Sequence, residues 1–177
     1  MPSKDLASAK RKSAKSSLVS ARRGPRRPQV TPESQLRKKR LQEFLVTPAK
    51  SAMKRNVVTV TARTTLRELE HLFETHDFNG FPVVEGHHLA GIVTKFDFLK
   101  NFIITPDNVF PHYGDLMKRT VEQIMTGQTF TVHPTTPLPR VLQMIVETRH
   151  KLFPVVDEKN RLLGVISRGD LIWAMKT

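Results

Sequence analysis

The stretch GFPVVEGHHLAGIVTKFDFL, residues 80–99, returns in altered form as LFPVVDEKNRLLGVISRGDLI, residues 152–172. Each copy runs from an apolar segment through a polar turn into a second apolar segment, and closes on a Ser or Thr three residues before an Asp. The Phe-Pro-Val-Val runs lie 72 positions apart, and one inserted residue in the turn moves the closings 73 apart. A single gap over about 50 residues indicates an internal duplication.

The similarity continues upstream, where Met53 aligns with Met125 and Leu66 with Leu138. The β-branched runs VVTV (57–60) and TFTV (129–132) predict a short strand at the start of each copy. Apolar residues at spacings of three and four then predict an amphipathic helix in each copy. With the hairpin and a closing helix, the predicted order is β-α-β-β-α, twice.

We therefore predict an α/β fold of two β-α-β-β-α repeats that pack on each other, because about 50 residues bury too little surface to be stable alone. The expected segments are a disordered basic tail (1–30), a helical lead-in (31–47), repeat 1 (48–104), a connector (105–120) and repeat 2 (121–177). The connector is expected to be loop with one short helical turn. In the lead-in, Thr31 as N-cap, Pro32 and Glu33 predict a helix over 33–46.

The excess of positive charge lies mainly at the N-terminus. Residues 1–47 hold 13 Lys and Arg against three acidic residues, whereas the other 130 residues hold 16 against 13. Residues 1–30 have few apolar side chains and are expected to be disordered. The Lys and Arg runs of residues 1–47 are compatible with binding to nucleic acid or to another anionic surface. They are also compatible with a solvated arm, because these runs lack aromatic residues for stacking bases.

Composition narrows the functional classes. The chain has no cysteine, which excludes disulfides and thiol catalysis and fits a reducing compartment. No apolar run approaches the roughly 18 residues of a membrane span, and we find no catalytic or metal-binding motif. We expect a cytoplasmic protein without a transmembrane segment, a required cofactor, a bound metal or enzymatic activity.

The twin openings, the twin Phe-Pro-Val-Val runs and the twin Gly-apolar-apolar-[Ser/Thr]-x-x-Asp closings resemble a tandem cystathionine-β-synthase-type (CBS) domain pair, also called a Bateman module. The resemblance covers about three quarters of the chain, residues 48–176. It implies two repeats packed sheet to sheet about a pseudo-two-fold axis, with two clefts between them. It also implies an adenosine-containing ligand (AMP, ADP, ATP or S-adenosylmethionine), homodimers, and a regulatory, energy-sensing role toward an unknown protein partner.

The repeated closing has two interpretations. In the first, Thr94 and Ser167 cap a helix, and Asp97 and Asp170 complete a capping box. In the second, each Asp accepts hydrogen bonds from the two hydroxyls of a ribose, for which a carboxylate is well suited, and the Thr or Ser orients the ribose or contacts phosphate.

Basic residues near the closings are candidate phosphate ligands. Lys95 and Arg168 directly follow the Thr and the Ser, although exposed Lys and Arg are most often only solvated. By resemblance, a basic residue three before the Pro reaches the phosphate, and Lys151 fits that position whereas Asn79 does not. We therefore expect unequal clefts, with the Asp170 closing dominating the binding of a phosphorylated adenosine.

The remaining expectations concern adenine, glycine and assembly. By resemblance, adenine contacts the first strand of each repeat, with candidates Val58, Val60, Phe130 and Val132. Gly91 and Gly164 are predicted to allow either close ligand approach or sheet packing. A dimer is expected because the closing helices carry more apolar residues than one small core needs, namely Phe98, Leu99, Phe102, Leu171, Ile172 and Trp173.

The sequence thus predicts a non-enzymatic regulatory module that senses an adenosine-containing ligand and modulates a partner. Two alternatives stay open. The first is a basic-tailed nucleic-acid-binding protein that uses the pair as a dimerising scaffold. The second is a purely structural interaction module with empty clefts.

Overall fold

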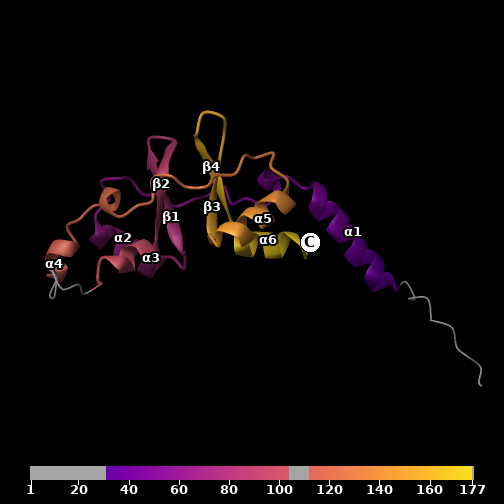
Figure 1. Cartoon of the computed structure of the whole chain (residues 1–177), viewed down its shortest axis with the longest axis horizontal. Helices are drawn as coiled ribbons and strands as arrows, with labels where there is room; N and C mark the ends of the chain where they lie inside the picture. Colours follow the sequence, from indigo (N-terminus) through magenta and orange to yellow (C-terminus); the bar gives the residue numbers. More distant parts are fainter. Residues whose placement is uncertain (1–30, 104–111, 177) are drawn as a thin grey trace, which may run out of the picture.

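The computed structural model describes residues 31–103 and 112–176, and the predicted disorder of 1–30 lies outside these residues. The two copies fold into matching units of helix, hairpin and helix (Figure 1). The first contains α2 (Leu66–Thr75), β1 (Gly80–Glu85), β2 (His88–Thr94) and α3 (Lys95–Lys100). The second contains α5 (Leu138–Thr148), β3 (Leu152–Val156), β4 (Leu162–Ser167) and α6 (Arg168–Ala174). The predicted helices and hairpins are confirmed.

The two hairpins have the same antiparallel register. Phe81 of β1 pairs with Val93 of β2, and Phe153 of β3 pairs with Ile166 of β4. All four of these side chains are fully buried. Each hairpin also shifts register at its Val-Val pair, at positions 83/84 and 155/156. The duplication seen in the sequence is therefore a duplication of backbone geometry.

The predicted first strands are wrong in extent, because each is reduced to a single parallel bridge. Val60 donates its N–H to the Pro82 carbonyl and accepts from the Val84 N–H, and Val132 is bonded in the same way beside Pro154. Extending either ladder by one step back along the predicted strand would require an N–H from Pro82 or Pro154, and proline has none. The two Phe-Pro-Val-Val runs therefore limit the neighbouring strands that were predicted beside them.

The opening of each repeat packs on the other repeat. After a short 3-10 helix, Ala49–Ser51, Lys54 forms a two-hydrogen-bond bridge with Val165 of β4. The equivalent helix, Val121–Gln123, leads to the same bridge between Thr126 and Ile92 of β2. In each case the opening of one repeat bonds to a strand of the other repeat, and we call this the exchange of the openings. The repeat alignment does not reveal it, because the alignment is the same whichever unit the opening contacts.

The exchange explains Gly91 and Gly164. A Cβ at Gly164 would lie 2.5 Å from the Lys54 carbonyl oxygen, and one at Gly91 would lie 2.5 Å from the Thr126 carbonyl oxygen. Both glycines therefore permit the opening of the other repeat to cross β2 or β4 closely. Of the two roles predicted for them, backbone packing is the one that these contacts support.

Two hydrophobic clusters form the core, one for each unit. The first-unit cluster includes Phe81, Leu66 and Leu69, together with Val121 from the opening of the second repeat. The second-unit cluster includes Phe153, Leu138 and Val141, together with Ala49 from the opening of the first repeat. Each unit thus completes its core with residues of the other.

The hairpins lie next to each other in the centre, with α2 and α3 on one outer side and α5 and α6 on the other (Figure 1). Leu89 donates its backbone N–H to the Asn160 carbonyl, and Leu162 donates to the His87 carbonyl, which joins the two hairpin turns. These bonds and the exchanged openings hold the two units together around a pair of clefts.

Helix α1 (Pro32–Val46) begins at the predicted Thr31 cap, and its axis leads away from the two units (Figure 1). Phe44 is its one buried residue, and α1 packs against α5. In the described part of the connector, the predicted short helical turn is α4 (Tyr113–Leu116).

Candidate functional site

Both repeated closings form capping boxes. Thr94 ends β2 and caps α3: its backbone N–H and hydroxyl donate to Asp97 Oδ2 at 3.0 and 2.5 Å, and the Asp97 N–H donates back to Thr94 Oγ1. Ser167 and Asp170 repeat this arrangement at the start of α6, with distances of 2.8 and 2.5 Å. The capping interpretation of the sequence is confirmed in both copies.

The capping box occupies only one oxygen of each carboxylate. The second oxygen of Asp97 lies 3.4 Å from Lys100 Nζ, and that of Asp170 lies 3.4 Å from Lys54 Nζ. Both aspartates are more than 90% buried, yet both line cavities between the units. The box therefore fixes each carboxylate while leaving its Oδ1 to an exposed lysine or to a ligand.

The Asp170 cleft has a volume of about 200 Å³. Asp170 and Ser167 come from the second unit, whereas Lys54 and Val58 come from the opening of the first repeat and Pro82 from β1. Because the opening of the first repeat crosses β4, the cleft is built from both repeats.

The Asp97 cleft has a volume of about 360 Å³ and is the pseudo-symmetric counterpart. Its first-unit residues include Thr94, Lys95 and Asp97, and Thr126 and Thr129 from the opening of the second repeat face them. The turn before β3 adds a basic edge, with Arg149, His150 and Lys151.

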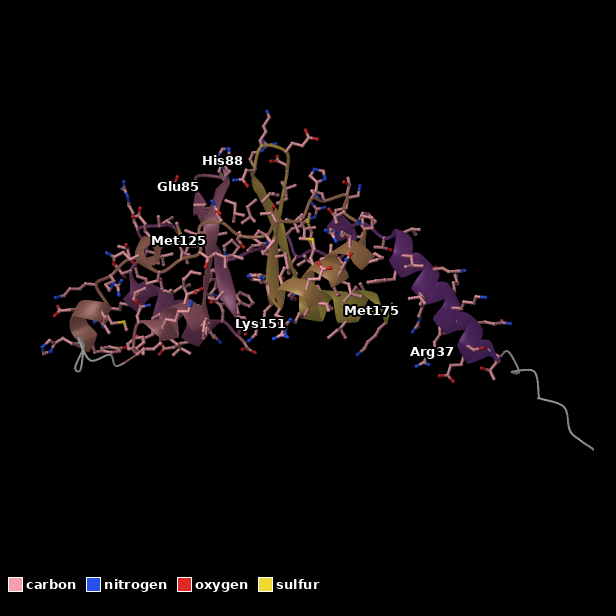
Figure 2. All side chains as sticks on the ribbon, in the orientation of Figure 1. Arg37, Glu85, His88, Met125, Lys151 and Met175 are labelled. Atoms are coloured by element: carbon pink, nitrogen blue, oxygen red, sulfur yellow. The ribbon has the colours of Figure 1, made fainter. Side chains whose placement is uncertain are left out.

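Lys151 lies between the two clefts and lines both (Figure 2). Its Nζ lies 3.4 Å from Asn79 Oδ1, and Asn79 also lines both clefts. These two residues occupy the same position in the two repeats, so the hydrogen bond crosses the pseudo-two-fold axis.

The structure brings most of the predicted site residues together. Thr94, Lys95 and Asp97 line one cleft, Val58, Ser167 and Asp170 line the other, and Lys151 lines both. Phe130 lines neither cleft; it is exposed, and its ring lies 5.6 Å from that of His150, which lines the Asp97 cleft.

Two predicted adenine contacts lie elsewhere. Val60 and Val132 are almost completely buried in the two cores, and their backbone groups are used in the parallel bridges. Neither residue lines either cleft. The prediction assumed a regular strand along each cleft, whereas each opening turns into the core after the residue that lines the cleft. The adenine contact of these two positions stays a prediction.

Arg168 also differs from its prediction. Its guanidinium donates to the backbone carbonyls of Arg149 and His150, at the end of α5, and it does not line the Asp170 cleft. Lys151 in turn belongs to both clefts. Lys151 and Arg168 were the basis for expecting phosphate in the Asp170 cleft. Neither residue distinguishes that cleft from the Asp97 cleft in the structure.

Sequence reasoning assigned no role to four basic side chains of the clefts: Lys54, Lys100, Arg149 and His150. Lys100 follows Asp97 by three residues on one helix, and that spacing was a usable signal. Lys54 reaches Asp170 only through the exchanged opening, so no local pattern predicts it.

In the described part of the chain, no group of three or more His, Asp or Glu side chains is arranged to hold a metal ion. Over the same residues, no helix has the length and apolar character needed to cross a membrane.

Comparison with known proteins also finds two repeats in the chain. The family model for the CBS domain matches residues 49–104 and again residues 121–177. The chain is 29% identical over 125 residues to inosine-5'-monophosphate dehydrogenase of Korarchaeum cryptofilum, covering 71% of this chain and 24% of that protein. It is 28% identical to the chloroplastic CBS domain-containing protein CBSX1 of Arabidopsis thaliana, covering 68% and 60%. The chain thus spans from a quarter to about three fifths of these two relatives.

Solved structures share the fold. CBSX2 in complex with AMP has a TM-score of 0.62 at 23% identity, covering 72% of this chain and 94% of that chain. The CBS domain of a bacterial CNNM/CorC family Mg²⁺ transporter, in complex with ATP, has a TM-score of 0.68 at 21% identity, covering 82% and 98%. The CBS domain pair of protein MJ0100, in complex with 5'-methylthioadenosine and S-adenosyl-L-methionine, has a TM-score of 0.59 at 25% identity, covering 72% and 98%.

Proposed function

The chain belongs to the CBS domain family, and from that premise we propose that it is a regulatory module which binds an adenosine-containing ligand and passes the bound state to a partner protein. The ligand class comprises AMP, ADP, ATP and S-adenosylmethionine, and the ligand acts as a regulator, with no cofactor required. We propose that the module binds the ligand without converting it. We also propose a cytoplasmic location, as expected from the sequence.

One observation carries the proposal: each cleft ends in a buried aspartate whose Oδ2 is held by a capping box and whose Oδ1 is approached only by an exposed lysine. A carboxylate fixed in this way presents acceptor oxygens to the vicinal hydroxyls of a ribose. Lys54 and Lys100 have side chains 67% and 52% exposed, so a ligand can displace them at little cost.

The adenine end of the proposed ligand has a backbone acceptor available. Because Pro82 cannot donate to it, the Val58 carbonyl lacks the ladder partner that a regular strand would give it, and Val58 lines the Asp170 cleft. The exocyclic amino group of adenine is a donor of the matching kind. Among the similar structures, the MJ0100 pair was solved with two adenosine-containing ligands, which supports the same ligand class.

A direct test is a thermal-shift screen of the full chain against AMP, ADP, ATP and S-adenosylmethionine. A ligand present at 100 times its Kd stabilises the folded state by about 2.7 kcal/mol, which raises the Tm by several degrees. Unchanged melting with every member of the class would contradict the proposal and favour a structural module with empty clefts.

We also propose that the module is a homodimer. Apolar side chains on α3 and α6 are more than half exposed: Phe96, Leu99, Ile172 and Trp173. Fewer apolar side chains are left exposed on these helices than the sequence suggested, because Phe98 and Phe102 pack against the first-unit core and Leu171 is buried. Helices α3 and α6 lie on the same side of the molecule, opposite the hairpin turns (Figure 1). Such a surface is typical of an interaction site.

A second candidate function rests on α1. Its residues 37–40 are four consecutive basic side chains, of which Arg37, Lys38 and Lys39 are exposed on a helix that projects from the two units (Figure 2). Binding to nucleic acid would fall steeply with salt and would be lost on deleting residues 1–47.

A further inference from the structure

The two clefts differ sharply in charge. In the Asp170 cleft, Lys54 and Lys151 face two carboxylates, Asp77 and Asp170. In the Asp97 cleft, a single carboxylate faces four basic side chains: Lys95, Lys100, Arg149 and Lys151. The lining residues therefore give the Asp97 cleft a surplus of positive charge. The Asp97 cleft remains the more positive of the two when Asp77 is counted with Lys95, the cation that it pairs with.

The surplus charge is available to a ligand. Lys100 Nζ lies 3.4 Å from Asp97 Oδ1, and Lys95 Nζ lies 3.9 Å from a fully exposed carboxylate, that of Asp77. Both lysine side chains are about half exposed, so these ion pairs hold them only weakly. A phosphate chain in the cleft can attract both amines without breaking a buried interaction.

Arg149 is held at the edge of the Asp97 cleft by its backbone. It ends α5 in the left-handed conformation, with φ at 60°. The Arg168 guanidinium donates to the carbonyls of Arg149 and His150, and the Arg168 N–H donates to the Lys151 carbonyl at 3.4 Å. Arg168 is thus a positioning residue for the basic turn of the opposite cleft.

We infer that the two clefts select ligands of different charge. The Asp97 cleft takes adenosine polyphosphates, and the Asp170 cleft takes adenosine ligands whose tail carries no net negative charge, such as adenosine itself or S-adenosylmethionine. Cavity volume supports the assignment, with about 360 Å³ for the Asp97 cleft and about 200 Å³ for the Asp170 cleft. The inference rests on the proposed function and reverses the expectation drawn from Lys151 and Arg168.

The test compares two matched lysines in the full chain. Lys100 and Lys54 each lie 3.4 Å from the free oxygen of the cleft aspartate, but they belong to different clefts. Lys151 is unsuitable because it lines both. Isothermal titration with ATP and with adenosine, on Lys100→Gln and Lys54→Gln, separates the clefts, and circular dichroism confirms that each variant is folded.

For ATP we expect Lys100→Gln to weaken binding about five- to tenfold, because a charged hydrogen bond to phosphate is lost in a half-exposed site. The Lys54→Gln variant is expected to bind ATP within twofold of wild type. The affinity for adenosine should change less than twofold in Lys100→Gln. Raising the salt concentration should weaken the binding of ATP far more than the binding of adenosine.

Two results would overturn the inference: an ATP affinity that falls as much in Lys54→Gln as in Lys100→Gln, or an adenosine affinity that falls as much as the ATP affinity in Lys100→Gln. In both cases adenosine compounds still bind, and the proposed function stands. Absence of binding by both compounds and by S-adenosylmethionine would instead overturn the proposed function, and this inference with it.

Discussion

Replacing Gly164 with alanine tests the exchange of the repeat openings on which both clefts depend. The new Cβ would lie 2.5 Å from the Lys54 carbonyl oxygen, whereas ordinary contact begins at 3.4 Å. The opening would have to move by about 0.9 Å, the difference between these two distances. Such a shift disrupts the two hydrogen bonds of 2.8 and 2.9 Å that join Lys54 and Val165.

The expected cost follows from these contacts. If the opening moves away, the loss of two backbone hydrogen bonds costs about 1 kcal/mol each. If the bonds are kept instead, overpacking costs about 1–3 kcal/mol. The reduced entropy of the unfolded chain returns about 0.4–1 kcal/mol. We therefore expect Gly164→Ala to lower the free energy of unfolding by about 1–2.5 kcal/mol, and Gly91→Ala, which meets the Thr126 carbonyl at the same 2.5 Å, to do the same.

Urea unfolding followed by circular dichroism measures both changes. The control is Gly114→Ala in α4, where an added Cβ meets nothing within 4 Å, so stability should be unchanged or slightly increased. If both Gly164→Ala and Gly91→Ala remain within about 0.5 kcal/mol of the wild type, the openings do not cross the opposite units as described.

Further predictions concern α1, the β3–β4 turn and assembly. Phe44→Ala removes the one buried side chain of α1, so limited trypsin digestion should cleave α1 faster while the two units stay resistant; an unchanged digestion rate would contradict the packing on α5. Bonds from the Arg161 backbone N–H and side chain hold the pKa of the Asp157 carboxyl below its ordinary 3.8, so its stabilising effect is complete above that pH and is lost as the pH falls through the lower folded-state pKa. Asp157→Asn should therefore reduce the acid-induced drop in urea midpoint, and an identical drop would argue against these bonds. Light scattering should give a dimeric mass for the wild type and a monomeric mass for Leu99→Lys, whereas a wild-type monomer at micromolar concentration would refute the homodimer.

Much of the fold was predictable because its signals are local. The spacing of Leu66 and Leu69 and of Leu138 and Val141 gave the helices, and the two apolar segments around each polar turn gave the hairpins. The first strands were overpredicted, since β-branched residues favour a strand but Pro82 and Pro154 in the neighbouring strand stop the ladder.

The candidate site was less predictable because its decisive contacts are long-range. The Ser/Thr-x-x-Asp closings identified both aspartates, as the two capping boxes show. The identity of the nearby cations depends on the exchanged openings and on the turn before β3. Lys54 reaches Asp170 from more than 100 positions away, and the Arg168 guanidinium bonds to a turn rather than facing the cleft.

The measurement that tests the central claim most directly is isothermal titration of ATP and S-adenosylmethionine into the full chain and into a double variant, Asp97→Asn with Asp170→Asn. Asparagine keeps an oxygen for the capping amides but removes the charge and one ribose acceptor. The account predicts saturable binding to the wild type and at least tenfold weaker binding to a double variant that is still folded by circular dichroism. No binding to the wild type, or equal affinity in the double variant, would contradict it.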